Sequence, residues 1–255
     1  MRTTLLVLGA ALIGGGALIA AAATTPSRIA SSAVTSESVE KAALGKEIRE
    51  YLIANPEVLV EAMQVLERKQ DGQREAVAQK AIREHKAELL NDPESPTGGN
   101  AGGDVTIVDF NDYQCPYCKR AHQAVKAVMS ADSKIRIVYK DLPILGEPSR
   151  IAALAALAAV AQGKHLALHE ALMEASGKLD RARILEIAAS VGLDVARLEK
   201  DMEDPKFKQL IDRNLALAGA LGIRGTPAFV VGDQFVPGAI DADTLKQLVA
   251  NARKR

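Results

Sequence analysis

Apolar residues recur at helical spacing along the first third of the chain. Ile48 and Leu52 lie four positions apart, and Leu59 and Met63 repeat that interval. Side chains three or four positions apart share one face of a helix, so the pattern predicts helices over residues 37–92. The apolar positions form a narrow stripe among many charged and amide side chains, and such a stripe needs a surface to pack against.

A proline divides this helical region. The residue before a proline avoids helical backbone angles, whereas proline itself is tolerated in a first helical turn. Asn55-Pro56 therefore predicts that one helix ends near Ala54 and that a second runs from about Pro56 to Leu90. Two interpretations of the stripe stay open: the helices pack against the rest of their own chain, or they join copies of the chain in a homo-oligomer.

Residues 91–104 mark a predicted domain boundary, because they concentrate Pro, Gly, Asn and Ser, which end helices and form turns. Beyond them, Val105–Phe110 and Lys134–Lys140 are β-branched runs of strand length, separated by a helical pattern that reaches Met129. Strand, helix and strand in this order predict a partly parallel sheet with a right-handed crossover.

A long helical stretch then interrupts the sheet. Residues 148–221 have helical patterns almost throughout, strand patterns resume over 227–231 and 234–236, and a last helix begins near Asp241. The prediction is an α/β domain with a helical insertion, preceded by an α-helical N-terminal region.

The first residues have the pattern of an export signal. Residues 1–23 combine Arg2, a long apolar run and small residues at Ala21 and Ala23. The alternative is an uncleaved membrane anchor, because the run is almost long enough to span a bilayer. Both interpretations place the rest of the chain outside the cytoplasm, in the periplasm, and residues 24–36 are predicted to be a flexible tether.

Charge and cysteine content narrow the function. The 32 basic residues balance the 32 acidic ones, so no net field draws the protein to nucleic acid or to an anionic membrane. The chain has two cysteines, Cys115 and Cys118, three positions apart. Exported compartments allow disulfides to form and persist, so spacing and compartment both favour redox use.

Both cysteines stand at the predicted start of a helix. There, unpaired backbone N–H groups and the positive end of the helix dipole would stabilise a Cys115 thiolate. Pro116 suits the first turn, and Cys118 returns to the same face within disulfide reach. The outer thiolate could attack a substrate disulfide and the inner thiol could resolve the product. Two alternatives stay open: a permanent structural bridge, and a metal site with His122, which supplies three ligands where structural zinc takes four.

Asp109 is a candidate acid. It lies six residues before Cys115 in a strand whose apolar neighbours predict burial on both faces. Burial would raise the pKa of its carboxyl and allow it to relay the proton of Cys118. The alternative is an aspartate at a strand end that caps a turn with Asn111 and Asp112.

Two stretches, VDFNDYQCPYCK (108–119) and GIRGTPAFVVG (222–232), resemble the bacterial DsbA family of thiol–disulfide interchange proteins. The resemblance covers residues 104–255. It implies a thioredoxin-like fold whose helical insertion occupies about 148–221.

The same resemblance implies residue roles. Cys115 would be the nucleophile, Cys118 the resolving thiol, Asp109 the buried acid and Pro227 a cis-proline that faces the pair. Three further residues are implied to contact an extended substrate segment: Thr226, Pro116 and Tyr117. One departure is Asp109 itself, because many relatives carry the longer glutamate there.

Residues 46–70 (KEIREYLIANPEVLVEAMQVLERKQ) are similar to the N-terminal domain of the suppressor-of-copper-sensitivity protein C group, also called copper resistance proteins with a thioredoxin domain. This resemblance implies a periplasmic disulfide isomerase that acts on misbridged exported proteins and oligomerises through residues 37–92. It also implies a link to copper tolerance, an unidentified redox partner, and no cofactor.

Oxidase and isomerase differ in how strongly the disulfide form oxidises its clients. Tyr117 stands where the strongest oxidases of the family carry histidine, and a tyrosine brings no positive charge to the thiolate. Thr226 before the proline also resembles the isomerases. The sequence thus favours an isomerase, with a DsbA-like dithiol oxidase as the alternative and a thiol-based copper or zinc protein as the second alternative.

Overall fold

The computed structural model describes residues 32–254, with side chains from residue 38 onward. These residues belong to two compact units that divide between Gln64 and Val65. The first unit contains helix α1 (Ser32–Ala54) and the beginning of helix α2 (Glu57–Glu84). The predicted helix end at Ala54 is confirmed, and the next helix begins one residue after Pro56.

Helix α1 starts earlier than we predicted. Its first residue is Ser32, so residues 32–36 of the predicted tether are helical. Adding a residue to an existing helix costs far less free energy than nucleating a new one. Helix α1 can therefore extend into residues 32–36, whose composition alone would not form a helix. Residues 1–23, with the predicted leader, lie outside the described residues. Between residues 32 and 254, no helix is long and apolar enough to cross a membrane.

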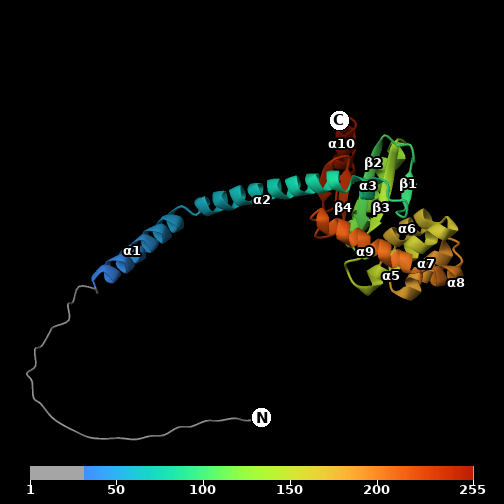
Figure 1. The fold of residues 1–255 in the computed structure, drawn as a ribbon, viewed down its shortest axis with the longest axis horizontal. Coiled ribbons are helices and arrows are strands. Elements are labelled where there is room, and N and C mark those ends of the chain that lie inside the picture. Colours follow the sequence, from blue (N-terminus) through green and yellow to red (C-terminus); the bar gives the residue numbers. More distant parts are fainter. Residues whose placement is uncertain (1–31, 255) are drawn as a thin grey trace, which may run out of the picture. The chain divides into compact units, whose positions relative to one another are not determined.

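The second unit is built on a five-stranded sheet (Figure 1). Its strands in spatial order are β1 (Thr97–Gly99), β3 (Ile135–Asp141), β2 (Val105–Asn111), β4 (Ala228–Val231) and β5 (Gln234–Pro237). Strands β2 and β3 are parallel, and the other neighbouring pairs are antiparallel. The predicted partly parallel sheet is therefore confirmed.

Helices cover both faces of the sheet. Helices α4 (Pro116–Ala131) and α10 (Ala242–Ala252) pack on one face, in a buried cluster that includes Ile107 and Phe229. The end of α2, helix α3 (Lys86–Leu90) and helix α9 (Pro205–Ala220) contribute to the cluster on the other face. Because successive strand residues point to opposite faces, β2, β3 and β4 are buried on both sides, and this explains their largely apolar sequences.

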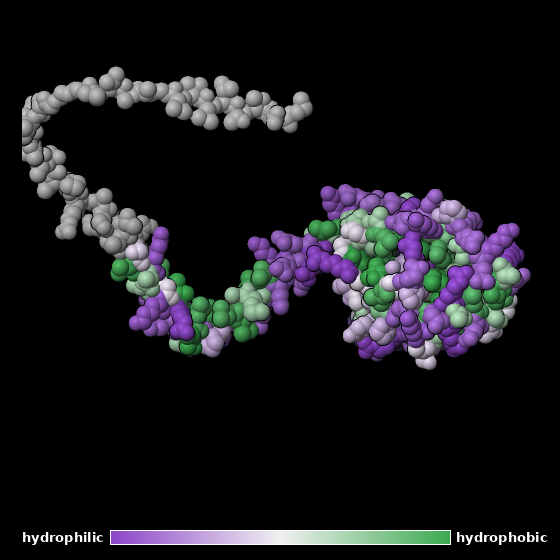
Figure 2. Space-filling model, turned by 90° about the horizontal axis from the view of Figure 1, so that it is seen from below, coloured by the Kyte–Doolittle hydropathy of each residue, from purple (hydrophilic) through white to green (hydrophobic). Residues whose placement is uncertain are grey.

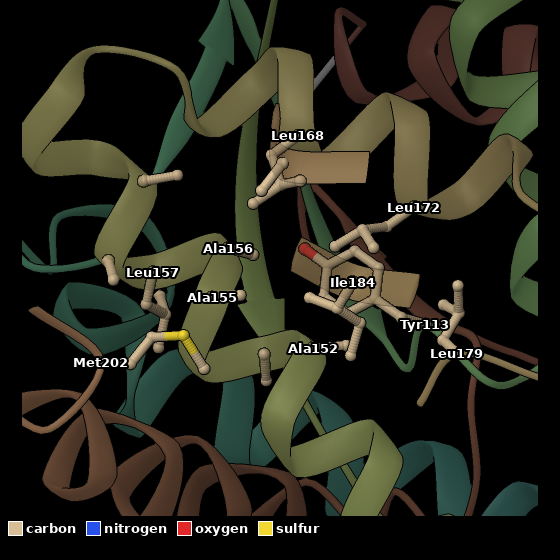
Figure 3. Close-up of a cluster of buried hydrophobic side chains, with 14 of the residues drawn as sticks. Tyr113, Ala152, Ala155, Ala156, Leu157, Leu168, Leu172, Leu179, Ile184 and Met202 are labelled. Atoms are coloured by element: carbon tan, nitrogen blue, oxygen red, sulfur yellow. The ribbon is translucent and has the colours of Figure 1, made fainter. Parts of the chain in front are cut away.

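The remaining helices form the predicted insertion. In Figure 1 the helices α5 to α8 gather beyond one end of the sheet. Their apolar side chains pack around Tyr113, which lies close to Leu172 and Ile184 (Figure 3). The insertion consists of α5 (Glu147–Ala158), a 3₁₀ turn (Ala159–Gln162), α6 (His165–Glu174), α7 (Arg181–Ser190), α8 (Val195–Asp201) and α9.

Two predictions between the N-terminal helices and the sheet were wrong. The second helix does not run unbroken to Leu90, because a turn at His85 separates α2 from α3. The stretch 91–104, predicted as turns only, contains strand β1. Residues before this stretch already belong to the core, since Ala81 and Leu89 are buried in the same cluster as Phe110. Compact packing of the second unit thus begins well before the predicted boundary.

A buried ion pair holds the segment between α3 and β1 against the sheet. The Lys140 ammonium, on β3, lies 2.9 Å from Asp92 Oδ2 and 2.7 Å from Ser95 Oγ. Burial lowers the pKa of Lys140, and the Asp92 carboxylate opposes that shift. A buried charge is tolerated only when it is paired and hydrogen-bonded, so this contact holds residues 92–95 against the strand that β1 joins.

Candidate functional site: the Cys115–Cys118 pair

The cysteine pair lies where β2 leads into α4. Cys115 is the residue before the first helical turn and has extended backbone angles, and Pro116 is the first helical residue. Pro116 lacks an N–H that would have no intrahelical partner in this position, which explains its place at the start. The predicted helix start at Cys115 is confirmed, and its sulfur therefore lies at the positive end of the α4 dipole.

Strand pairing brings a distant segment to this thiol. Phe110 of β2 pairs with Ala228 of β4, so the residues just before β4 lie beside the loop that carries Cys115. The Thr226–Pro227 peptide bond is cis, as the resemblance implied. Cys115 Sγ donates a hydrogen bond to the Thr226 carbonyl oxygen over 3.2 Å, and the Cys115 residue is 4% exposed.

Cys118 lies deeper, one helical turn along α4. It is 2% exposed, and the Asp112 backbone N–H donates to its sulfur over 3.4 Å. Burial raises the pKa of the Cys118 thiol well above its ordinary value, so this group is protonated at neutral pH. Both cysteines are free in this structure, which is therefore the reduced form.

Asp109 lies on β2 beneath the helix of the cysteines. It is 5% exposed, and its Oδ1 has no hydrogen-bond partner among the described residues. Burial, and after it the nearby Asp141 carboxylate, raise the pKa of Asp109 to about 8. A group that titrates near neutral pH can take up and release protons, which favours the predicted acid role over the capping role.

The capping role belongs to Asp112. Its Oδ1 accepts from Gln114 N–H at 2.8 Å, and its Oδ2 accepts from Ile144 and Leu145 N–H at 2.9 and 3.0 Å. Asp112 thereby ties the loop before Cys115 to the loop after β3. The sequence marks Asp112 only as a companion of Asp109, because the loop at 144–145 gives no local signal of this contact.

Replacing Asp112 with alanine is expected to lower the free energy of unfolding of the reduced protein by about 2–4 kcal/mol, because three N–H groups lose their acceptor in a buried place. Urea denaturation measures this. Asp180→Ala is the matched control, since the exposed Asp180 caps α7 through a single N–H and should cost about 1 kcal/mol. Equal losses in the two variants would show that Asp112 does not hold the loops.

An open groove adjoins the thiols. Its lining includes Tyr117, Arg120, Thr226, Pro227 and Ile240. Tyr117 is 54% exposed, and the Arg120 guanidinium lies over its ring, 4.6 Å from the centroid. The groove thus brings together Tyr117 and Thr226, two of the three residues implied to contact substrate, with the cis-proline Pro227, whereas Pro116 is not part of its lining.

The structure does not arrange Cys115, Cys118 and His122 as a metal site. His122 lies one turn beyond Cys118 on α4 and is buried. Among residues 32–254, no group of three or more His, Cys, Asp or Glu side chains is placed to hold a metal ion.

A family model for the DSBA-like thioredoxin domain matches residues 106–250. The chain belongs to the DSBA-like thioredoxin domain family. A second model, for the N-terminal domain of the copper resistance protein ScsC, matches residues 40–73. Together these matches identify a DsbA-like thiol–disulfide oxidoreductase of the ScsC type.

Solved structures agree with this assignment. A thioredoxin-like oxidoreductase from Silicibacter pomeroyi DSS-3 is 50% identical, with a TM-score of 0.65 over 66% of this chain and 98% of that one. A variant of Proteus mirabilis ScsC is 30% identical, with a TM-score of 0.65 over 89% of this chain and 98% of that one.

Curated relatives of another kind share a shorter region. Na(+)/H(+) antiporter NhaA 1 from Salinispora arenicola is 31% identical over 150 residues, which are 58% of this chain and 23% of the antiporter. The chain spans about a quarter of the length of the first of these relatives, so the match carries no antiport activity to it.

Proposed function

We propose that this oxidoreductase is a periplasmic protein disulfide isomerase that works as a homo-oligomer on misbridged exported proteins. The observation that carries the proposal is a series of exposed apolar side chains on α1 and the first half of α2, whose aliphatic members are coloured green in Figure 2. They coincide with the ScsC N-terminal match at residues 40–73. The series comprises Val39, Leu44, Ile48, Tyr51, Ile53, Leu59, Val60, Met63, Val65 and Leu66.

Isolated helices with so much exposed apolar surface are unusual in a soluble monomer. Two occupants could cover the surface: the chain's own catalytic unit or other copies of the chain. We favour other copies, because these side chains lie on the segment that matches the N-terminal domain of ScsC, and the resemblance to that group implies oligomerisation through this segment. Several catalytic units in one particle would act on one client, and this suits repeated shuffling of its disulfides.

The proposed reaction begins with Cys115. Its thiolate attacks one sulfur of a substrate disulfide, forming a mixed disulfide and releasing the other substrate sulfur as a thiolate. In isomerisation, a second substrate thiolate attacks the mixed disulfide, which forms a new substrate disulfide and returns Cys115 as a thiolate. Electrons balance without any external oxidant, so the pair needs only to be kept reduced by its redox partner.

Cys118 resolves a mixed disulfide that no second substrate thiolate attacks. It gives its proton to the carboxylate form of Asp109 and attacks Cys115, which releases the substrate thiolate and leaves a Cys115–Cys118 disulfide. Thr226 would offer its backbone groups to an extended substrate segment, in the manner of an added strand, with Pro116, Tyr117 and Pro227 beside it. In the reduced form the Thr226 carbonyl accepts from the Cys115 thiol.

The periplasmic location rests on the pattern of residues 1–23, and we carry a link with copper tolerance over from the name of the N-terminal family. A DsbA-like dithiol oxidase is the second candidate, because the unit after Val65 by itself contains both thiols and the groove.

The test uses substitutions rather than truncation, since deleting the whole of 37–92 would remove Ala81 and Leu89 from the core. Met63→Asp with Leu66→Asp is expected to convert the oligomer to a monomer and to lower reactivation of scrambled ribonuclease about tenfold. Both side chains are exposed, at 63% and 54%, so the folded monomer should tolerate the change. Sedimentation and ribonuclease activity are the measurements.

Gln64→Asp with Gln70→Asp is the matched control, because it adds the same charge at exposed polar positions of α2. It should leave assembly and activity unchanged. A wild-type chain that sediments as a monomer, or a monomeric variant with full isomerase activity, would refute the oligomeric isomerase.

A further inference from the structure

A layer of buried polar side chains separates the sheet from α4 and α6. On neighbouring parallel strands, Asp109 pairs with Tyr139 and Asn111 pairs with Asp141. Alternation along each strand turns all four side chains to the face that α4 covers. Asp141 is buried, and neither of its carboxyl oxygens has a hydrogen-bond partner among the described residues, as is also true of Oδ1 of Asp109. Two carboxyl groups therefore lie close together beneath the thiol pair.

Tyr113 connects these carboxyl groups to the helical insertion. It lies in the loop between β2 and Cys115, and its hydroxyl is 3.0 Å from Nδ1 of His169 on α6. Burial, and after it the Asp141 carboxylate, raise the pKa of Tyr113, so the phenol stays protonated and can donate to His169. Tyr113 therefore contacts the imidazole of His169 and lies near enough to Asp141 for that carboxylate to act on its pKa.

His122 lies between His169 and the surface. The two rings meet edge to face, with centroids 5.3 Å apart, and Nε2 of each has no hydrogen-bond partner among the described residues. On the outer side of His122, Lys126 Nζ lies 2.7 Å from Glu174 Oε1 and 3.7 Å from Glu170 Oε2, and all three side chains are partly exposed. Polar groups therefore extend from the buried thiol to solvent.

We propose that Asp109, Asp141, Tyr113, His169 and His122 form the route by which the proton of Cys118 reaches solvent during thiol–disulfide exchange. The route rests on the proposed acid role of Asp109. When Cys118 attacks the mixed disulfide, its proton passes to Asp109, one sulfur–sulfur bond replaces another, and the substrate leaves as a thiolate. The proton then moves outward through Asp141, Tyr113 and the two imidazoles, and the reverse path operates on reduction.

Energetics favour passage in both directions. Burial raises the pKa of Asp141 to about 7, close to the value of about 8 for Asp109, so neither carboxyl strongly retains the proton against the other. Burial lowers the pKa of His169, so its imidazole is neutral and Nδ1 can accept from Tyr113 while Nε2 gives up a proton.

Other ionisable groups border the route without belonging to it. Tyr139 of β3 lies beside His169, with ring centroids 4.3 Å apart, and His165 of α6 contacts both rings, with its centroid 5.3 Å from Tyr139 and 5.8 Å from His169. Asp112, in the loop before Cys115, holds the pKa of Asp141 higher. The remaining ionisable groups around the route are Cys115, Cys118, Lys126, Glu170 and Glu174.

The test is Tyr113→Phe, with Tyr139→Phe as the matched control that removes the same hydroxyl from a neighbouring buried tyrosine. Stopped-flow kinetics follow Cys118 as it displaces glutathione from a Cys115–glutathione mixed disulfide, between pH 5 and 9, in light and heavy water. Tyr113→Phe is expected to slow this step about tenfold near pH 7 and to enlarge its solvent isotope effect, because proton passage becomes the slowest event. Tyr139→Phe should match the wild type.

The equilibrium constant with glutathione should be the same in Tyr113→Phe and wild type, since a route changes rates and not equilibria. An unchanged rate in Tyr113→Phe, or an equal loss in Tyr139→Phe, would overturn the route. Asp109→Asn tests the acid role separately from the route. If Cys118 displaces glutathione slowly in Asp109→Asn but at the wild-type rate in Tyr113→Phe, the acid role stands and the route is wrong. If Asp109→Asn is itself normal, both are wrong.

Discussion

Replacing Cys115 with serine is expected to abolish thiol–disulfide exchange, with a rate loss of at least about 10³-fold, because a hydroxyl at the helix start is a far weaker nucleophile than a thiolate. The position of Cys115 beside Thr226 makes it the sulfur that meets a substrate in the groove. Release of a fluorophore from a disulfide-linked peptide measures the rate.

Cys118→Ser is the paired variant and should behave differently. It keeps the attacking thiol and removes the resolving one, so mixed disulfides between Cys115 and client proteins should accumulate on non-reducing gels. The assignment of the two roles would be reversed if Cys115→Ser trapped clients and Cys118→Ser did not.

Asp109→Asn is expected to have opposite effects on stability and on activity. The folded-state pKa of Asp109 is about 8, above the ordinary value of 3.8. Between those values the folded protein holds a proton that the unfolded chain has released, so the free energy of unfolding falls as pH rises through this window. An amide does not titrate, and the variant should therefore be more stable than wild type by about 5 kcal/mol at pH 8.

The same variant should resolve mixed disulfides about 10²-fold more slowly at pH 7, because Cys118 loses its proton acceptor. Urea denaturation of the reduced proteins at pH 5 and pH 8 measures the first effect, and the kinetics of Cys118 attack measure the second. Asp243→Asn is the control, since it removes the same charge from an exposed position on α10. Parallel pH profiles of stability in wild type and Asp109→Asn would contradict the assignment of Asp109.

The sheet could be predicted where one sequence signal dominates. Strands β2 and β3 are continuous β-branched runs, because both faces are buried. Strand β1 escaped prediction because its Gly98 and Gly99 resemble a turn. A Cβ on Gly98 would lie 3.1 Å from the Ile137 side chain, and one on Gly99 only 2.5 Å from the Ile135 carbonyl oxygen, so the glycines there allow close approach of two strands.

The residues of the site also differ in whether the sequence alone could predict them. Cys115, Cys118 and Pro227 belong to compact motifs, and a motif can be found without knowledge of the fold. No local motif marks Asp141 or His169, because their neighbours come from strands, loops and helices far apart in the sequence. The pair His165 and His169, four positions apart on one helix face, was the available signal for the polar layer.

Reactivation of scrambled ribonuclease tests the central claim most directly. The chain without residues 1–23 is incubated with wrongly bridged ribonuclease in a glutathione buffer that keeps Cys115 and Cys118 reduced, and oxidation of a reduced peptide is followed in parallel. The isomerase account predicts that ribonuclease activity returns, that peptide oxidation is slow, and that Cys115→Ser supports neither reaction. Rapid peptide oxidation without recovery of ribonuclease would contradict it and identify a DsbA-like oxidase.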